Sequence, residues 1–342
     1  MAAIGASVSA ELGRYFEREI REQPDVWERL AQSDAATELA AALEGDVLLI
    51  GSGSSLFAAQ LGAIALRRRG IDATAVAATE APADHLAYEG RTVVAISQSG
   101  RSTDVLRALE ALRPRRIVAL TNTADSPLGA VADVTIDVGA GPERAIPATK
   151  SVSSTIAILL AAATLLGGAT TRCAAVLVAT ARTIRVWLED SAATLLSPAT
   201  MIAARSNVVI VGTDYGAPIA REAALKFKEA TYLHAEGFEA GEFRHGSAAM
   251  VDASTAVIGI VDRDGSPVVG RAMHDLHATG ALRVAVGTTP LEGVPRLGPI
   301  VDDPYNTLAW LVTVQLLALY VARGRGIDSD APRGLTKAVV SE

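Results

Sequence analysis

The stretch DVLLIGSGSSLFAAQLGAIALRRRG, residues 46–70, joins a short apolar run to a glycine-rich turn and then to a helical pattern. The apolar run, Val47–Ile50, is unbroken, which is typical of a strand buried on both faces of a parallel sheet. The turn covers 51–55, and the helix follows it at once. The order of strand, glycine turn and helix predicts the first unit of an α/β fold.

The same layout recurs in NVVIVGTDYGAPIAREAALKFKEA, residues 207–230, where Gly212 aligns with Gly51 at an offset of 161 residues. Further strand-like runs follow in both halves, at 92–100, 116–122, 134–138, 255–265 and 282–287. Strands that alternate with helices predict parallel sheets, and this long period predicts a duplicated domain. The fold class is therefore α/β, with two doubly wound sandwiches in tandem.

The linear organisation follows from this repeat. We expect a helical N-terminal segment (1–30), a first domain (31–185), a second domain (186–325) and a C-terminal tail (326–342). The stretch 170–204 is predicted to be helical and to join the two halves.

Composition limits the class of protein. The net charge of −7 and the pI near 5.4 argue against nucleic acid or an anionic membrane as a partner. The single cysteine, Cys173, cannot form an intramolecular disulfide, which favours a reducing cytoplasm. No signal peptide is apparent, and the longest apolar stretches, 155–166 and 308–321, are shorter than the roughly 20 residues of a membrane span. We expect a soluble protein in which both stretches are buried helices.

Two hydroxyl-rich loops are candidate ligand sites. GSGSS (51–55) lacks the third glycine of a dinucleotide fingerprint, because Leu56 stands in its place. SQSGRST (97–103) also runs from a strand into a helix. Hydroxyls beside the N–H groups at the start of a helix suit a phosphate monoester. The alternative is that these Ser and Thr residues only cap their helices.

A second group of candidates lies in 222–246. A helix there places Glu222, Lys226 and Glu229 on one face. The ordinary interpretation is a surface ion pair contributing roughly 0.2–0.5 kcal/mol, and the alternative is that Glu229 faces a cleft. His234 and His245 follow, and composition alone does not rank them.

The chain has only four lysines, Lys150, Lys226, Lys228 and Lys337. A lysine amine can attack a carbonyl to form an imine, whereas an arginine cannot. A carboxylate base, an imidazole, such an amine and a phosphate cradle together suit proton transfer between C1 and C2 of a sugar phosphate. No metal-ligand spacing is present, so neither a metal nor a cofactor is expected.

These motifs, in this order, resemble the sugar isomerase (SIS) domain family, and within it the isomerase half of glucosamine-6-phosphate synthases. The resemblance spans nearly the whole chain and is carried by EIREQP (19–24), GSGSS (51–55), SQSGRSTD (97–104), ATKSV (148–152), EAALKFKEATYLHAEGFEAGEFRHG (222–246) and DSDAPRGLTKAVVSE (328–342).

The resemblance implies roles for particular residues. It makes Glu229 the isomerisation base, His245 the ring-opening group supplied by the neighbouring subunit of a homodimer, Lys337 the imine-forming amine and Lys226 a lysine of the same pocket. Backbone contacts to the sugar are implied at Ile146 and Thr336, and phosphate contacts at Gly53, Ser54, Ser55, Ser97, Gln98, Ser99 and Ser102.

The resemblance also implies an activity. Synthases carry an N-terminal glutaminase domain, whereas here the isomerase half starts almost at Met1, so we expect a stand-alone deaminase that converts a hexosamine 6-phosphate and water to a ketose 6-phosphate and ammonia. A deglycase of fructosamine 6-phosphates and a non-catalytic sugar-phosphate sensor are the alternatives. The PRxLxK pattern ending at Lys337 favours the deaminase over the deglycase.

Overall fold

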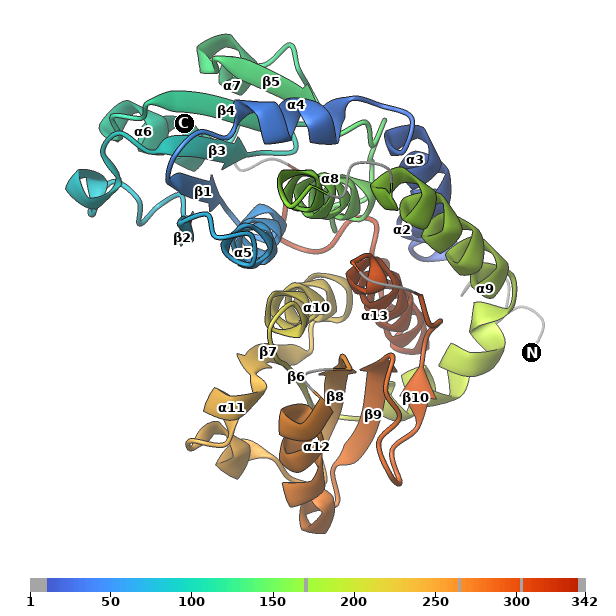
Figure 1. Ribbon diagram of the computed structural model, residues 1–342. Coiled ribbons are helices and arrows are strands. Elements are labelled where there is room, and N and C mark those ends of the chain that lie inside the picture. Colours follow the sequence, from blue (N-terminus) through green and yellow to red (C-terminus); the bar gives the residue numbers. More distant parts are fainter. Residues whose placement is uncertain (1–10, 169–171, 264–265, 302–303, 338–342) are drawn as a thin grey trace. The chain divides into compact units, whose positions relative to one another are not determined.

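The computed structural model describes residues 11–168, 172–263, 266–301 and 304–337 (Figure 1). The backbone divides into two compact units, and each unit is built from three separate segments of the chain. Unit 1 holds Met1–Pro24, Arg144–Thr149 and Thr180–Leu335, and unit 2 holds Asp25–Glu143, Lys150–Ala179 and Thr336–Glu342.

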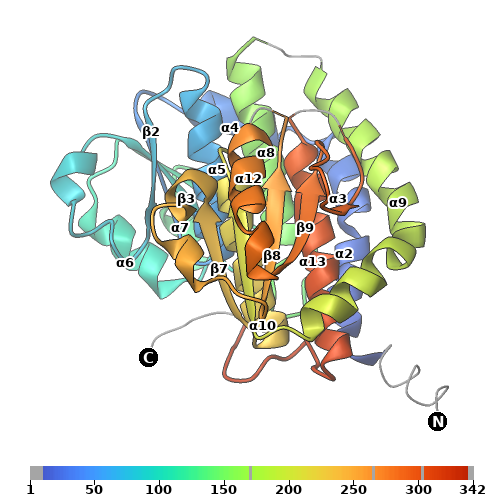
Figure 2. The same cartoon turned by 90° about the horizontal axis from the view of Figure 1, so that it is seen from below.

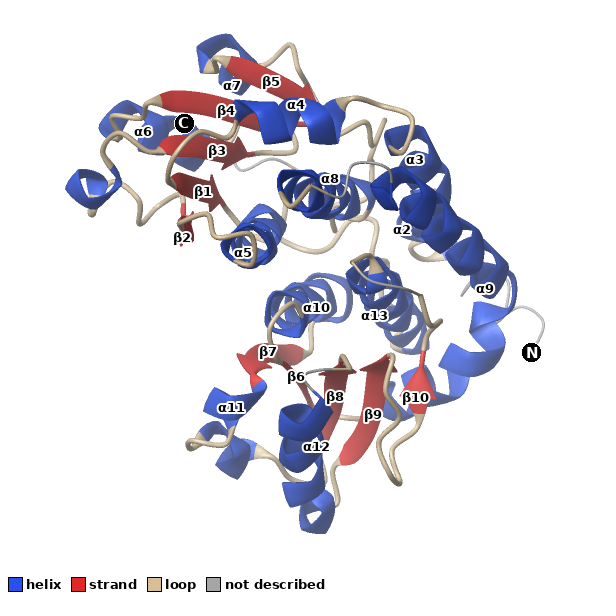
Figure 3. Ribbon diagram, viewed as in Figure 1, coloured by secondary structure: helices blue, strands red, loops and turns tan. Residues whose placement is uncertain are grey.

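Unit 2 contains the first predicted sheet, drawn as red arrows in Figure 3. Its strands are all parallel, in the order β2-β1-β3-β4-β5. They are β1 (Val47–Gly51), β2 (Ala73–Ala77), β3 (Thr92–Ile96), β4 (Arg116–Thr121) and β5 (Val134–Asp137). Every residue of β1 and β3 is buried, because these two strands lie inside the sheet and have helices on both faces.

Side chains of the unit 2 strands point alternately to the two faces of the sheet, and helices pack on both faces. Leu48, Ile50, Val93 and Ala95 pack with residues of α6 (Thr103–Ala111) and α7 (Pro127–Val131). On the opposite face, α5 (Ser54–Arg67) packs against α8 (Lys150–Leu166), so closely that a Cβ on Gly62 would lie 2.9 Å from Leu159. The remaining helical elements are α3 (Gln23–Leu30), α4 (Ala35–Ala42) and η1 (His85–Tyr88). This is a doubly wound sandwich.

Unit 1 repeats the topology. Its parallel sheet has the order β7-β6-β8-β9-β10, the same connectivity as in unit 2. The strands are β6 (Asn207–Gly212), β7 (His234–Glu239), β8 (Thr255–Val261), β9 (Leu282–Gly287) and β10 (Arg296–Leu297). The predicted duplication and the α/β fold class are thus confirmed.

Helices also cover both faces of this second sheet. Core residues of β6, β8 and β9 pack with α11 (Ala240–Phe243) and α12 (Ser266–Asp275), which lies over the sheet in Figure 2. Helices α10 (Gly216–Thr231) and α13 (Asn306–Gly324) pack together on the other side (Figure 1). The unit also holds α2 (Arg14–Arg21), η2 (Ser247–Met250) and η3 (His277–Thr279).

Gly51 and Gly212, the two aligned glycines, are required for the same steric reason. A Cβ on Gly51 would lie 2.8 Å from the backbone of Ser55, and one on Gly212 would lie 2.3 Å from the carbonyl oxygen of Gly216. In both repeats the first turn of the helix therefore packs directly on the end of the strand, where only glycine fits.

The predicted long helix is present as α9 (Arg172–Ala203), with a non-helical residue at Asp190. Helix α13 is the one described helix long and apolar enough to cross a bilayer by length and composition, with a mean hydropathy of 1.4, but 89% of it is buried inside the protein. The strand-like runs predicted from the sequence do not include β2, β7 or β10. All three are edge strands with partly exposed residues, and β7 and β10 contain charged residues that interrupt an apolar pattern.

Candidate functional site

Two loops of unit 2 lie side by side at the carboxyl edge of the sheet. One follows β1 and the other follows β3, and these strands are neighbours at the point where the strand order reverses. Ligands of open parallel sheets bind at this point. The structure thus brings the predicted residues Gly53, Ser54 and Ser55 to the same edge as Ser97, Gln98, Ser99 and Ser102.

The serine at the start of α6 does not cap that helix. Ser102 occupies the N-cap position, but its hydroxyl accepts no hydrogen bond from the first turn. Helix α5 starts after Gly53, which has no side chain to cap with and has a positive φ of 57°. The capping interpretation therefore does not apply to these two N-caps, and the N–H groups of both first turns face the carboxyl edge.

The second loop requires glycine at position 100. Gly100 has a φ of 62°, and a Cβ there would lie 2.0 Å from the Ser126 hydroxyl oxygen. Its N–H donates to the carbonyl of Ser97 at 3.1 Å, and the N–H of Arg101 donates to the Ser99 hydroxyl at 3.2 Å. The loop is thus preorganised around its polar residues.

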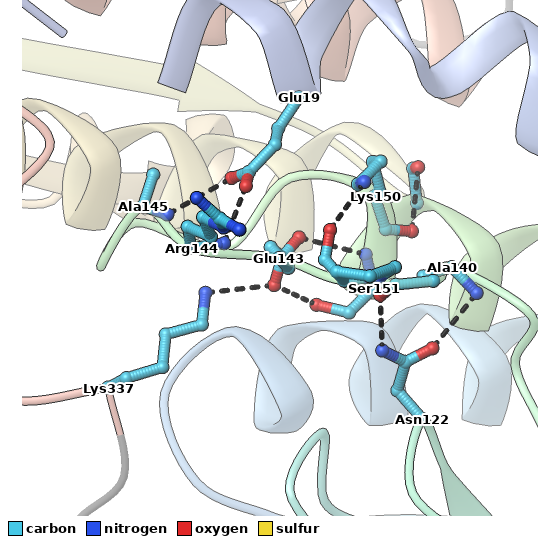
Figure 4. A network of polar contacts seen from close by, with 12 residues as sticks. Glu19, Asn122, Ala140, Glu143, Arg144, Ala145, Lys150, Ser151 and Lys337 are labelled. Carbon is cyan, nitrogen blue, oxygen red and sulfur yellow. Dashed lines mark hydrogen bonds and ion pairs between the residues drawn. The ribbon is translucent and has the colours of Figure 1, made fainter. Parts of the chain in front are cut away.

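Asn122, just after β4, connects this loop to the next polar segment. Its backbone N–H donates to the carbonyl of Gln98 at 3.0 Å. Its side-chain amide donates to the carbonyl of Gly141 at 2.7 Å and accepts from the N–H of Ala140 at 2.9 Å (Figure 4). One side chain therefore links the candidate phosphate loop to the segment that contains Glu143.

Glu143 binds the predicted imine-forming lysine. The Lys337 amine lies 3.0 Å from a carboxylate oxygen of Glu143, whose side chain is fully buried. Ser151 donates to the same carboxylate from its N–H at 3.1 Å and from its hydroxyl at 2.7 Å (Figure 4). The neighbouring Lys150 amine donates to the carbonyl of Pro142 at 2.7 Å. A buried carboxylate needs such partners, and Lys337 is one of them.

In unit 1 the predicted ionic stripe of α10 is buried. The Lys226 amine lies 2.5 Å from a carboxylate oxygen of Glu229 and 3.5 Å from one of Glu222. Lys226 and Glu222 are inaccessible to solvent, whereas 16% of the Glu229 side chain is exposed. The surface-pair interpretation is wrong, because a desolvated pair interacts far more strongly than an exposed one. Within the triad only Glu229 has appreciable access to a ligand.

The other predicted residues occupy varied positions. Ile146 donates its N–H to the carbonyl of Asp330 at 3.2 Å, and Thr336 is exposed. His245 is exposed after α11, and its contribution across a dimer stays a prediction. The ring of His234 is exposed and lies 2.9 Å from a Glu236 carboxylate oxygen on the same strand.

The C-terminal segment is attached to the start of α2 in unit 1. The Asp330 carboxylate accepts hydrogen bonds from the N–H groups of Tyr15 and Phe16 at 2.8 and 2.7 Å, and Asp328 accepts one from Gly13 at 2.9 Å. These bonds satisfy amides that the helix itself leaves unpaired. The segment carrying Lys337 is therefore anchored before it reaches that lysine.

A buried carboxylate also shapes the loop next to Glu143. The side chain of Glu19, fully buried on α2, accepts hydrogen bonds from the N–H groups of Arg144 and Ala145 at 2.5 and 3.2 Å (Figure 4). This gives the EIREQP motif a structural purpose in unit 1.

Sequence reasoning missed Asn122 and Glu143. A polar residue at the end of a third parallel strand was a usable signal for Asn122. The partner of Glu143 is 194 positions away, and no local pattern indicates such a pair. Among the described residues, no group of three or more His, Cys, Asp or Glu side chains is placed to hold a metal ion.

Comparison with known proteins agrees with this organisation. The family model described as SIS domain matches residues 43–165 and 201–293, one stretch in each repeat. The chain is 33% identical to a glutamine–fructose-6-phosphate aminotransferase (isomerizing) of Aeropyrum pernix and 32% identical to that of Pyrobaculum aerophilum. Each alignment covers 95% of this chain and 57% of the relative, so the chain spans little more than half of their length.

Solved structures share the fold. A putative phosphosugar isomerase from Silicibacter pomeroyi is 27% identical, with a TM-score of 0.79 over 92% of this chain and 99% of that chain. A glucosamine-6-phosphate deaminase from Thermotoga maritima is 24% identical, with a TM-score of 0.77 over 96% of this chain and 100% of that chain. At this lower identity the likeness concerns the fold alone.

Proposed function

Because this chain belongs to the SIS domain family, we propose that it is a phosphosugar isomerase whose substrate is a hexosamine 6-phosphate. The overall reaction is glucosamine 6-phosphate plus water to fructose 6-phosphate plus ammonia. The observation that carries the proposal is the ion pair between Lys337 and Glu143, which the hydrogen bonds of Asn122 connect to a phosphate-type loop in the same unit.

Phosphate recognition is assigned to unit 2. The loops after β1 and β3 offer serine hydroxyls and the N–H groups of two helix N-termini. Such a site favours a dianionic group, because the N–H groups and hydroxyls can form short hydrogen bonds to the phosphate oxygens. Neither loop, 51–55 or 97–102, contains an aspartate or a glutamate that would repel the phosphate.

The covalent step is assigned to Lys337. Once proton transfer from C2 to C1 has turned the C2–N bond into an iminium, the Lys337 amine attacks C2, the bond from C2 to the substrate nitrogen breaks, and ammonia leaves. Water then hydrolyses the lysine imine at C2, which gives the ketose 6-phosphate and frees Lys337. The attacking amine must first lose a proton, and the Glu143 carboxylate at 3.0 Å is placed to accept it. Ring opening, which precedes this step, is assigned by resemblance to His245 of a second subunit in a homodimer.

Proton transfer between C1 and C2 is assigned to Glu229 in unit 1. The buried Lys226 amine lies 2.5 Å from one oxygen of the Glu229 carboxylate and so fixes its orientation. The partial exposure of the Glu229 side chain leaves it accessible to a ligand. Lys226 thus acts on the reaction through Glu229. A positioned carboxylate of this kind contributes typically a factor of 10²–10⁴ to the rate.

A coupled assay tests the proposal. Purified protein is incubated with glucosamine 6-phosphate, galactosamine 6-phosphate and fructoselysine 6-phosphate, and ammonia, lysine and ketose 6-phosphate are measured. We expect ammonia and ketose 6-phosphate from a hexosamine substrate. Release of lysine at a higher rate than ammonia selects a deglycase instead, and ligand binding without turnover selects a sensor.

Two variants test the assigned residues. Glu229→Gln removes the base and keeps the phosphate loops, so turnover should fall by about 10³-fold while fructose 6-phosphate still binds. Lys337→Arg keeps the positive charge beside Glu143 but cannot form an imine. Full activity of Lys337→Arg would reject the covalent step. Borohydride treatment of the wild type with substrate should label Lys337.

A further inference from the structure

Helix α10 ends in an unusual backbone conformation. Tyr232, its C-cap residue, has a φ of 57°, and among the described residues only Asp214 shares a positive φ without being glycine. The left-handed region is unfavourable for a residue with a side chain, and glycine is the common choice at the end of a helix. An aromatic residue persists in such a conformation when surrounding contacts hold it there.

Two contacts join Tyr232 to the C-terminal segment of the same unit. The phenol oxygen accepts a hydrogen bond from the backbone N–H of Arg333 at 2.8 Å. The guanidinium carbon of Arg333 lies 4.3 Å from the centre of the Tyr232 ring. The hydroxyl thus holds the backbone of Arg333 and the ring holds its side chain. Glycine at this position would relieve the strain but make neither contact.

The position of Arg333 in the chain makes these contacts consequential. The aspartate anchors at Asp328 and Asp330 hold the segment to α2, and Arg333 follows them and precedes Lys337 by four residues. Arg333 is nearer to Lys337 in the sequence than either aspartate, so its attachment leaves a shorter length of chain between the last anchored residue of the segment and the lysine. Tyr232 also follows Glu229 by three residues on the helix that carries the proposed base.

We infer that Tyr232 is a positioning residue, which fixes the segment carrying Lys337 by holding Arg333 through both its hydroxyl and its ring. This inference rests on the proposed function for its effect on turnover, whereas the attachment of the segment is measurable without any substrate. Tyr232 contacts no reacting atom in this scheme and acts through Lys337.

Hydrogen exchange and kinetics together test the inference. Tyr232→Phe removes only the hydroxyl, and Tyr232→Gly removes hydroxyl and ring while suiting the positive φ, so the glycine variant is expected to fold. Tyr88→Phe is the matched control, because the Tyr88 ring also faces an arginine, Arg91, at 6.0 Å. Exchange is followed in peptides covering 328–337, and kcat and KM are measured with glucosamine 6-phosphate.

We expect the Arg333 amide to exchange about tenfold faster in Tyr232→Phe and about 100-fold faster in Tyr232→Gly. We expect kcat to fall about tenfold and about 100-fold respectively, with KM within about threefold of wild type, because the phosphate loops are unchanged. Tyr88→Phe should match wild type in both measurements.

Unchanged exchange at Arg333 in Tyr232→Gly overturns the attachment. Faster exchange of the Arg333 amide in the Tyr232 variants with a wild-type kcat overturns the positioning role of Tyr232. A lower kcat in these variants with unchanged exchange at Arg333 also overturns it. If the wild type turns over none of the three sugar phosphates, the proposed function fails, and exchange alone still decides whether Tyr232 holds the segment.

Discussion

At the scale of single residues, Glu143 is the buried carboxylate that pairs with Lys337, the proposed imine-forming residue. Its carboxylate is buried, accepts two hydrogen bonds from Ser151 and pairs with Lys337. A charge buried in this way is stable only while its partners are present. The same carboxylate therefore orients the lysine and offers a proton acceptor next to it.

Replacing this charge is the sharpest test at the residue scale. Glu143→Gln keeps the side-chain volume but loses the negative charge and the proton acceptor for Lys337. We expect kcat to fall by about 10²-fold and borohydride labelling of Lys337 to fall with it. Glu89→Gln, at an exposed pair with Arg113, is the control and should match wild type. Wild-type labelling in Glu143→Gln would contradict the role assigned to Glu143.

Gly100 allows a second residue-scale prediction. Gly100→Ala meets both an unfavourable φ of 62° and the Ser126 hydroxyl, whereas Gly90→Ala meets a similar φ of 75° in open space. Both variants should lose about 1 kcal/mol of unfolding free energy from the backbone, and Gly100→Ala should lose about 1–3 kcal/mol more. Chemical denaturation measures the difference. The KM of Gly100→Ala for glucosamine 6-phosphate should also rise. Equal stability of Gly100→Ala and Gly90→Ala would contradict the packing argument.

At the scale of elements, an ion pair joins α2 to α13 within unit 1. Glu17 lies 2.7 Å from the Arg323 guanidinium and 2.9 Å from that of Arg21. Burial would raise the pKa of Glu17, but the hydrogen bonds and charges of Arg323 and Arg21 outweigh burial and hold the pKa below its ordinary value of 4.5. The pairing thus stabilises the packing of the two helices only while Glu17 is ionised.

The lowered pKa of Glu17 predicts a pH dependence of stability. Its contribution is fully present above the ordinary value of 4.5 and is lost as the pH falls through the lower folded pKa. Glu17→Gln should therefore lower the unfolding free energy by about 1 kcal/mol at pH 7, and by less near about pH 3. Urea unfolding at both pH values measures this. Glu38→Gln, at an exposed position of α4, should show no such difference. An effect of Glu17→Gln that is independent of pH would argue against the ion pair.

At the scale of the whole molecule, the two repeats share a topology but differ in the chemistry of their loops. In unit 2 the loops after β1 and β3 carry serines. In unit 1 the corresponding loops carry Asp214 after β6 and Asp262 after β8, and Asn306 donates a hydrogen bond to Asp262 at 3.2 Å. Carboxylates repel a phosphate dianion, so the duplicated fold has diverged at its ligand edge.

This divergence predicts one phosphosugar site in each chain. Calorimetric titration with fructose 6-phosphate should give a stoichiometry of one per chain despite two repeats. Ser99→Ala with Ser102→Ala should weaken binding at least tenfold, whereas Thr213→Ala, in the loop after β6, should leave it unchanged. A stoichiometry of two per chain, or sensitivity to Thr213→Ala, would contradict the assignment of phosphate binding to unit 2.

The sequence by itself determined the duplicated α/β fold, and it singled out the two serine-rich loops that are proposed to bind phosphate. Buried strands such as Val47–Ile50 have a continuous apolar pattern, and the glycines that end them are required by local sterics, so both are visible in short stretches. Edge strands such as β7 lack that pattern because one side of the strand is exposed.

Only the tertiary structure decided the remaining features. It showed that the α10 ion pair is buried, and that Tyr232 accepts a hydrogen bond from Arg333. It also showed that Asn122 bonds the loop after β3 to Gly141 and that Glu143 pairs with Lys337. The physical reason is that these interactions join residues far apart in the sequence, and burial depends on neighbours that no local pattern encodes.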